Sequence, residues 1–106
     1  MRAIDRDHLA AQTGGDDGLA AEILGLFADQ CRRLLPGIAD RSMAAGDRAD
    51  LAHTLKGSAA GIGAACVRDL AGRVEAGLRA GGEPASEIAA LAEAAAAALA
   101  EIADAA

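Results

Sequence analysis

Residues 51–62 combine side chains whose types and spacing favour chemistry at a protein surface. On a helical wheel, with about 100° per residue, they separate into two faces. One face holds Leu51, Leu55, Ser58 and Ile62, and the other holds His53, Lys56, Gly57 and Ala60. The first set predicts a buried stripe and the second a face that points to solvent.

His53 is the predicted reactive residue of the outward face. A neutral imidazole carries a lone pair on one ring nitrogen, and such a nitrogen can attack an electrophile such as phosphorus. Lys56 follows one turn later on the same face, so its ammonium group can offset the negative charge of a phosphoryl group. The pair therefore predicts a phosphate-accepting histidine with a compensating cation.

Gly57 is an unusual choice for a helix surface. A glycine inside a helix costs about 1 kcal/mol relative to alanine, and a solvated face ordinarily carries Glu, Lys or Gln. A position without a side chain lets the backbone of another molecule approach His53, and Ala60 extends this low surface. We therefore predict that Gly57 gives clearance to a partner.

Glycines and prolines divide the chain into segments with helical periodicity. They predict a leader helix over about 4–12, then helices over about 17–45, 47–62, 64–80 and from 84 onward. Asp16 or Asp17 should cap the second helix, and Asp47 the third. The alanine-rich composition, with Phe27 as the single aromatic residue, also favours helices. The predicted fold is all-α: residues 1–106 form one antiparallel four-helix bundle with a short additional N-terminal helix across its end.

The predicted second helix has an apolar surface wider than a single contact needs. Leu19, Ile23, Leu26, Phe27 and Leu34 form one stripe, and Leu24, Cys31 and Leu35 form another. The second stripe is either more core or a surface on which a partner docks, and the sequence leaves both interpretations open.

Composition excludes several classes of function. A net charge of −6 argues against nucleic-acid binding, which relies on clustered Lys and Arg. There is neither an apolar run of membrane-spanning length nor a signal peptide, so we expect a cytoplasmic protein without a membrane segment. Cys31 and Cys66 have neither Cys-x-x-Cys spacing nor a neighbouring histidine, so we expect two core residues, no metal site and no cofactor.

The segment His-Thr-Leu-Lys-Gly-Ser-Ala at 53–59, followed by Ile-Gly-Ala at 62–64, resembles the signature of histidine-containing phosphotransfer (HPt) domains. The resemblance continues in Gly-Gly-Asp at 14–16, in Phe27 and in Gly-Asp at 46–47. In that family the histidine is phosphorylated, and the lysine and glycine after it belong to the exposed site. Those residues here are His53, Lys56 and Gly57. Some members add a polar residue that hydrogen-bonds the imidazole, and Glu75 is the candidate for that role.

The resemblance implies a monomeric bundle that relays phosphoryl groups to and from aspartates of response-regulator receiver domains. A sensor histidine kinase, hybrid or not, is the other implied partner. The receiver would supply Mg²⁺ and most of the catalytic groups, so the chain is expected to be a carrier without autonomous kinase activity.

Two alternatives come from different classes of protein. The phosphoacceptor domain of a sensor kinase usually has an acidic residue directly after the histidine, whereas Thr54 follows here. A bundle that only binds partners through Leu24, Cys31 and Leu35 would have no use for His53. Away from this site, we expect Ser58 to donate to the carbonyl of Thr54 and His8 to lie at the surface.

Overall fold

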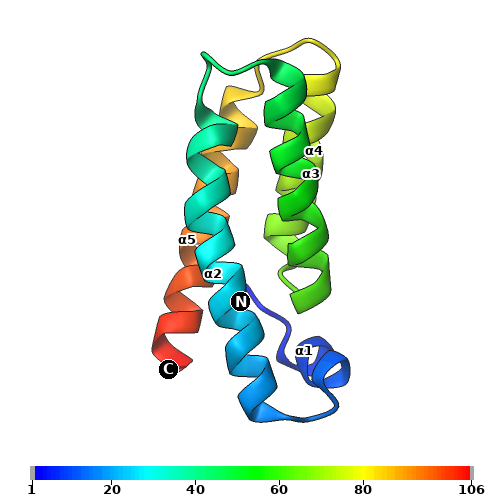
Figure 1. Cartoon of the computed structure of the whole chain (residues 1–106), viewed down its shortest axis with the longest axis vertical. Helices are drawn as coiled ribbons and strands as arrows, with labels where there is room; N and C mark the ends of the chain where they lie inside the picture. Colours follow the sequence, from blue (N-terminus) through cyan, green and yellow to red (C-terminus); the bar gives the residue numbers. More distant parts are fainter. Residues whose placement is uncertain (1, 106) are drawn as a thin grey trace.

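The structure, a computed structural model, describes residues 2–105, and this range contains five helices and no strand. The helices are α1 (Arg6–Thr13), α2 (Asp17–Ala39), α3 (Ala45–Ile62), α4 (Ala65–Arg79) and α5 (Ala85–Ala105). Figure 1 shows α2 to α5 running antiparallel along the longest axis, with α1 across the end where α2 begins and α3 ends. The predicted all-α bundle with an additional N-terminal helix is therefore confirmed. Over the described range, no helix is both long and apolar enough to cross a membrane.

Aspartates set the starts of the first two helices. The carboxylate of Asp5 accepts hydrogen bonds from the backbone nitrogens of Asp7 and His8 at the start of α1. Asp16 accepts one from Leu19 at the start of α2. Each bond satisfies a backbone donor that has no partner within the helix. The prediction of a cap at Asp16 or Asp17 is thus confirmed at Asp16.

The predicted boundary between the second and third helices is wrong. α2 ends at Ala39 rather than near Ala45, because Asp40 redirects the chain. Its carboxylate accepts hydrogen bonds from the backbone nitrogen of Ser42 at 2.9 Å and from the Ser42 hydroxyl at 2.6 Å. α3 then begins at Ala45, and no side chain caps it. Asp47 lies inside its first turn, where a negative charge suits the helix dipole.

Gly63 ends α3, as the sequence predicts, and it also allows the leader to pack closely. Its φ of 78° is in the left-handed region that favours glycine. A Cβ atom at this position would lie 3.1 Å from the carbonyl oxygen of Asp5 and 3.2 Å from the Cβ of His8. The backbone nitrogen of Asp5 donates to the Gly63 carbonyl at 3.0 Å. The leader is therefore fixed across the turn between α3 and α4.

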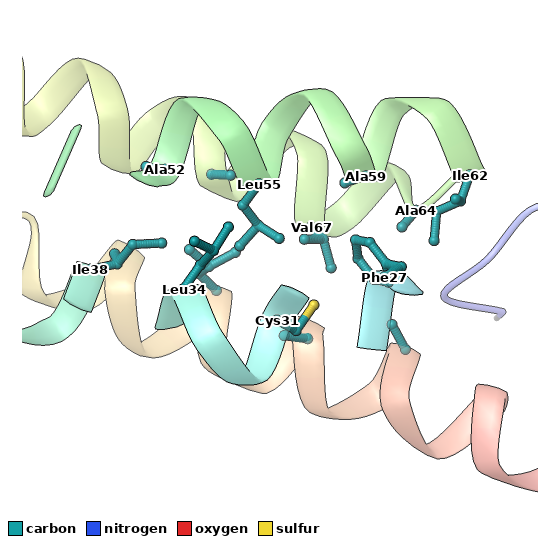
Figure 2. Close-up of a cluster of buried hydrophobic side chains, with 14 of the residues drawn as sticks. Phe27, Cys31, Leu34, Ile38, Ala52, Leu55, Ala59, Ile62, Ala64 and Val67 are labelled. Carbon is teal, nitrogen blue, oxygen red and sulfur yellow. The ribbon is translucent and has the colours of Figure 1, made fainter. Parts of the chain in front are cut away.

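The core lies inside a ring of four helices, in which α2 and α4 each contact both α3 and α5. The buried residues of α2 lie within about 60° of Cys31 on a helical wheel. They are Leu24, Phe27, Ala28, Cys31, Leu34 and Ile38. Figure 2 shows Phe27, Cys31 and Leu34 between α2 and the helices opposite, beside Leu55 and Val67. The core therefore needs one arc of α2 rather than two separate stripes.

This arc corrects several predictions about apolar residues. Cys31 is fully buried and Leu24 is 4% exposed, so neither offers a docking surface. Leu35 is half-buried against the core. Leu26, expected in the core, is 63% exposed because it lies on the far side of α2. Cys66 is exposed on α4, so only one of the two cysteines is a core residue.

The buried face of α3 is also shifted from the predicted stripe. Leu55 and Ile62 are buried as expected, whereas Leu51 and Ser58 are only half-buried. Ala49, Ala52 and Ala59 are buried in addition, because α3 packs against α4 as well as α2. Within the described range, the expected hydrogen bond from Ser58 to the Thr54 carbonyl is not formed, whereas the Thr54 hydroxyl donates to the Asp50 carbonyl at 3.1 Å.

At the end of the bundle opposite α1, the buried side chain of Arg48 links three segments of the chain. Arg48 is 3% exposed, and its Nε donates to the carbonyl oxygen of Ile38 at 2.9 Å. Its two terminal nitrogens donate to the two carboxylate oxygens of Glu83 at 2.7 and 2.9 Å. This Arg48 cluster (Arg48, Glu83 and the Ile38 carbonyl) ties the end of α2 and the start of α3 to the loop before α5. No part of this cluster was predicted from the sequence.

Candidate functional site

His53 lies in the middle of α3, on the side that faces away from the core. Its side chain is 63% exposed, whereas Ala52 before it and Leu55 after it are fully buried. The helix period alone explains this contrast, because successive residues point about 100° apart. The prediction that His53 lies on an outward face is confirmed.

Glu75 of α4 reaches the imidazole of His53. Its two carboxylate oxygens lie 3.2 and 3.1 Å from the Nδ1 atom of His53. The carboxylate also accepts a hydrogen bond from Lys56 Nζ at 2.8 Å and one from Arg79 Nε at 3.0 Å. Only 13% of the Glu75 side chain is exposed, so three neighbouring groups take the place of water around it. The sequence identified Glu75 as a candidate partner of His53, and the structure brings the two together.

Glu75 is ionised at neutral pH. The hydrogen bond from Lys56 is the largest of the effects that lower its pKa to about 2, and Arg79 and His53 lower it further although burial acts in the opposite direction. An ionised carboxylate can only accept hydrogen bonds. The proton of a neutral His53 imidazole therefore belongs on Nδ1, which leaves the lone pair on Nε2.

Two further residues complete the group and were not found from the sequence. Arg79 bonds Glu75 on one side and, through Nη2, donates to Asp50 Oδ1 at 3.0 Å on the other. Both bonds raise the pKa of Arg79, and the bond to Asp50 has the larger effect. Spacing could have indicated both residues, because Asp50 lies three residues before His53 and Arg79 four after Glu75. We call the five residues His53, Glu75, Lys56, Arg79 and Asp50 the His53 cluster.

The surface beside His53 lacks side chains over two turns of α3. Apart from the adjoining residues and backbone of α3 itself, no atom lies within 4 Å of a Cβ built on Gly57 or on Gly61, and Ala60 between them is exposed. The prediction that Gly57 faces open space is confirmed, and Gly61, expected only at the helix end, belongs to the same surface. We call Gly57, Ala60 and Gly61 the clearance strip.

The remaining titratable residues singled out from the sequence do not join this site. His8 is half-buried in α1, and its Nε2 is buried without a hydrogen-bond partner in the described part of the chain. Cys66 lies beside the leader, near Asp5 and Gly63. Across residues 2–105, no three His, Cys, Asp or Glu side chains are grouped as ligands for a metal ion.

The fold and the site together define a class of protein: a helical bundle that presents a histidine, held by a carboxylate, on the outer face of a central helix. A model of the Hpt domain family matches residues 22–105, and the chain belongs to that family. Hpt domains carry out histidine phosphotransfer in two-component phosphorelays, as carriers that interact with response regulators and kinases. Searches of curated proteins and of solved structures found no match.

Proposed function

We propose that this chain, acting as a cytoplasmic monomer and a single domain, carries a phosphoryl group on His53. The group comes from, or passes to, the aspartate of a response-regulator receiver domain, and a sensor histidine kinase, hybrid or not, is the second partner. The observation that carries the proposal is the hydrogen bond between Nδ1 of an exposed His53 and the ionised Glu75 carboxylate. A phosphoryl carrier needs such a ring, with one nitrogen fixed and the other accessible.

In the transfer step, the Nε2 lone pair of His53 forms a bond to the phosphorus of the receiver's aspartyl phosphate. The bond between that phosphorus and the aspartate oxygen breaks, and its electron pair leaves with the carboxylate. The Nδ1 proton stays on the ring, which becomes positively charged, and Glu75 stabilises this charge through its hydrogen bond. The reverse step returns the phosphoryl group by the same movements. The receiver supplies Mg²⁺ and most of the catalytic groups.

Lys56 has a suitable position to offset the added negative charge. Its side chain is 37% exposed, and among the described residues its ammonium group bonds only Glu75. An ammonium group has three donors, so two remain for the oxygens of a phosphoryl group. Before transfer, the charges of Lys56 and Arg79 balance those of Glu75 and Asp50, so the phosphoryl group arrives at a neutral surface.

The clearance strip supports a direct approach of the receiver. Without side chains at Gly57 and Gly61, the partner's backbone can lie close to α3 and bring its aspartate to His53. Ala60, which is exposed between the two glycines, belongs to this contact surface. A bundle that only binds partners would need neither the strip nor the bond between His53 and Glu75.

The test is transfer from a phosphorylated receiver domain to wild-type protein and to His53→Gln. We expect an acid-labile, alkali-stable phosphate on the wild type and none on the variant, with equal urea midpoints for both because residue 53 is exposed. Equal labelling of the two proteins, or no labelling of the wild type, would refute the proposal. His8→Gln, which removes the other histidine, is the matched control and should be labelled like the wild type.

A further inference from the structure

Arg79 is the second cation of the His53 cluster, and it differs from Lys56 in the number of carboxylates to which it donates hydrogen bonds. Arg79 bonds Glu75 through Nε and Asp50 through Nη2, both at 3.0 Å. Lys56 bonds Glu75 alone among the described residues. The two cations of the cluster are therefore not equivalent, because Arg79 has a second carboxylate partner, Asp50, and Lys56, within the described range, shares only Glu75.

We propose that Asp50 is a positioning residue that holds Arg79 on Glu75 and away from the phosphoryl group, so that Lys56 alone neutralises that group. The inference rests on the proposed function and deepens it. Asp50 lies one turn before His53 on α3, and its side chain is 71% exposed. Such an exposed carboxylate contributes little to folding. Asp50 lies beside His53 and bonds Arg79, which in turn bonds Glu75, so its role is electrostatic.

Charge decides how Arg79 behaves when the phosphoryl group arrives. With Asp50 ionised, moving the Arg79 guanidinium toward the phosphoryl oxygens would break its bond to Asp50 and form one to the phosphoryl group. One ion pair replaces another, so little free energy is gained. With Asp50 neutral, the same movement gains a charge-assisted hydrogen bond at no such cost. Asp50 therefore keeps the phosphoryl group weakly held, which suits a group that must leave again.

The experiment uses the full chain phosphorylated by phosphoramidate, so that no partner is needed. The Nε2 lone pair attacks phosphorus, the phosphorus–nitrogen bond of phosphoramidate breaks, and ammonia leaves after taking a proton from water. The readout is the pH midpoint of the second ionisation of the phosphoryl group, followed by ³¹P NMR. A nearby cation favours the dianion and lowers this midpoint.

Asp50→Asn should lower the midpoint by about 0.3 to 0.7 pH units, the twofold to fivefold effect of one exposed ion pair. Lys56→Ala should raise it, and adding Asp50→Asn to Lys56→Ala should bring it back toward the wild-type value. Asp29→Asn is the matched control, because Asp29 is 70% exposed and pairs with Arg32 at 3.2 Å on α2. It removes the same charge and should leave the midpoint unchanged.

Arg79→Gln separates release of Arg79 from simple loss of repulsion. In that background, Asp50→Asn should shift the midpoint by less than half as much as it does in the wild type. An equal shift in the two backgrounds, or a shift no larger than that of Asp29→Asn, would overturn the role of Asp50 while leaving His53 as the acceptor. A wild-type chain that takes no phosphoryl group at His53 would overturn the proposed function itself.

Discussion

Two clusters of charged side chains join α3 to its neighbours, and each pairs an arginine with a glutamate. In the Arg48 cluster the arginine is 3% exposed, and both its partners lie outside α3, on Ile38 and Glu83. In the His53 cluster the glutamate is less exposed, at 13%, than the lysine and arginine that bond it, at 37% and 46%. The first cluster closes an end of the bundle, whereas the second surrounds a histidine that faces solvent.

The same ion pair stabilises the bundle in the Arg48 cluster, whereas in the His53 cluster we propose that it serves chemistry. A buried guanidinium must have its donors satisfied, because an unpaired buried charge is very costly. Arg48 meets this condition with two carboxylate oxygens and a carbonyl. Lys56 keeps unused donors at the surface, where they cost little and can receive a new anion.

The largest effect we expect is on stability, from Arg48→Met. This change keeps the apolar volume but removes the buried bond to the Ile38 carbonyl and both bonds to Glu83, which among the described residues keeps only Arg41 at 3.6 Å. The unfolding free energy should therefore fall by about 2 to 3 kcal/mol. Urea denaturation with an unchanged m-value measures it. Arg68→Met, which breaks the exposed pair with Asp69, is the control and should change stability by less than about 0.5 kcal/mol. A similar loss of unfolding free energy in the two variants would mean that the Arg48 cluster stabilises the fold no more than an exposed ion pair does.

Gly57→Glu should separate function from stability at the His53 cluster. Its side chain would occupy the clearance strip and add a negative charge, so we expect phosphotransfer from a receiver to slow by about tenfold or more, which is 1.4 kcal/mol or more in activation free energy. Gly57→Ala is the matched control: it fits the open space, should transfer at nearly the wild-type rate and should raise stability by about 0.5 to 1 kcal/mol. Rapid transfer by Gly57→Glu would disprove the close approach of a partner.

The smallest effect concerns acid stability and Glu75. Its pKa is about 2 in the folded chain against an ordinary value of 4.5, so its stabilising contribution is complete above pH 4.5 and is lost as the pH falls toward 2. The urea midpoint of Glu75→Gln should therefore fall less steeply over this range than that of the wild type. Glu93→Gln, at an exposed position on α5, should follow the wild type. Parallel curves for all three proteins would mean that the Glu75 interactions do not stabilise the folded state.

Much of this molecule could be predicted from its sequence, because local signals and global fold agree. Glycine positions and apolar periodicity gave the helices, and the outward face of α3 followed from its period. The start of α3 was misplaced because Ala44 provides no side-chain cap there. Asp40 and Ser42 form the turn that ends α2, and a carboxylate two residues before a serine was the available signal.

What could not be predicted depends on which helices pack together. Glu75 was found as a candidate because the family resemblance implies a polar residue near the histidine and because Glu75 lies beside the apolar stripe of its helix. Spacing within each helix could indicate Asp50 beside His53 and Arg79 beside Glu75, but the contact between Asp50 and Arg79 crosses two helices, and no pattern within one helix fixes that distance. Arg48 gave no local signal, since its partners are 10 and 35 positions away along the chain.

The clearance strip also limits how partners can be told apart. Discrimination between similar proteins requires atoms that clash with the wrong one or pair only with the right one. Gly57, Ala60 and Gly61 offer almost no such atoms, so we expect this part of α3 to accept any receiver of suitable shape. We then expect selectivity to be encoded at the borders of the strip, where substitutions would redirect signalling without disturbing the histidine.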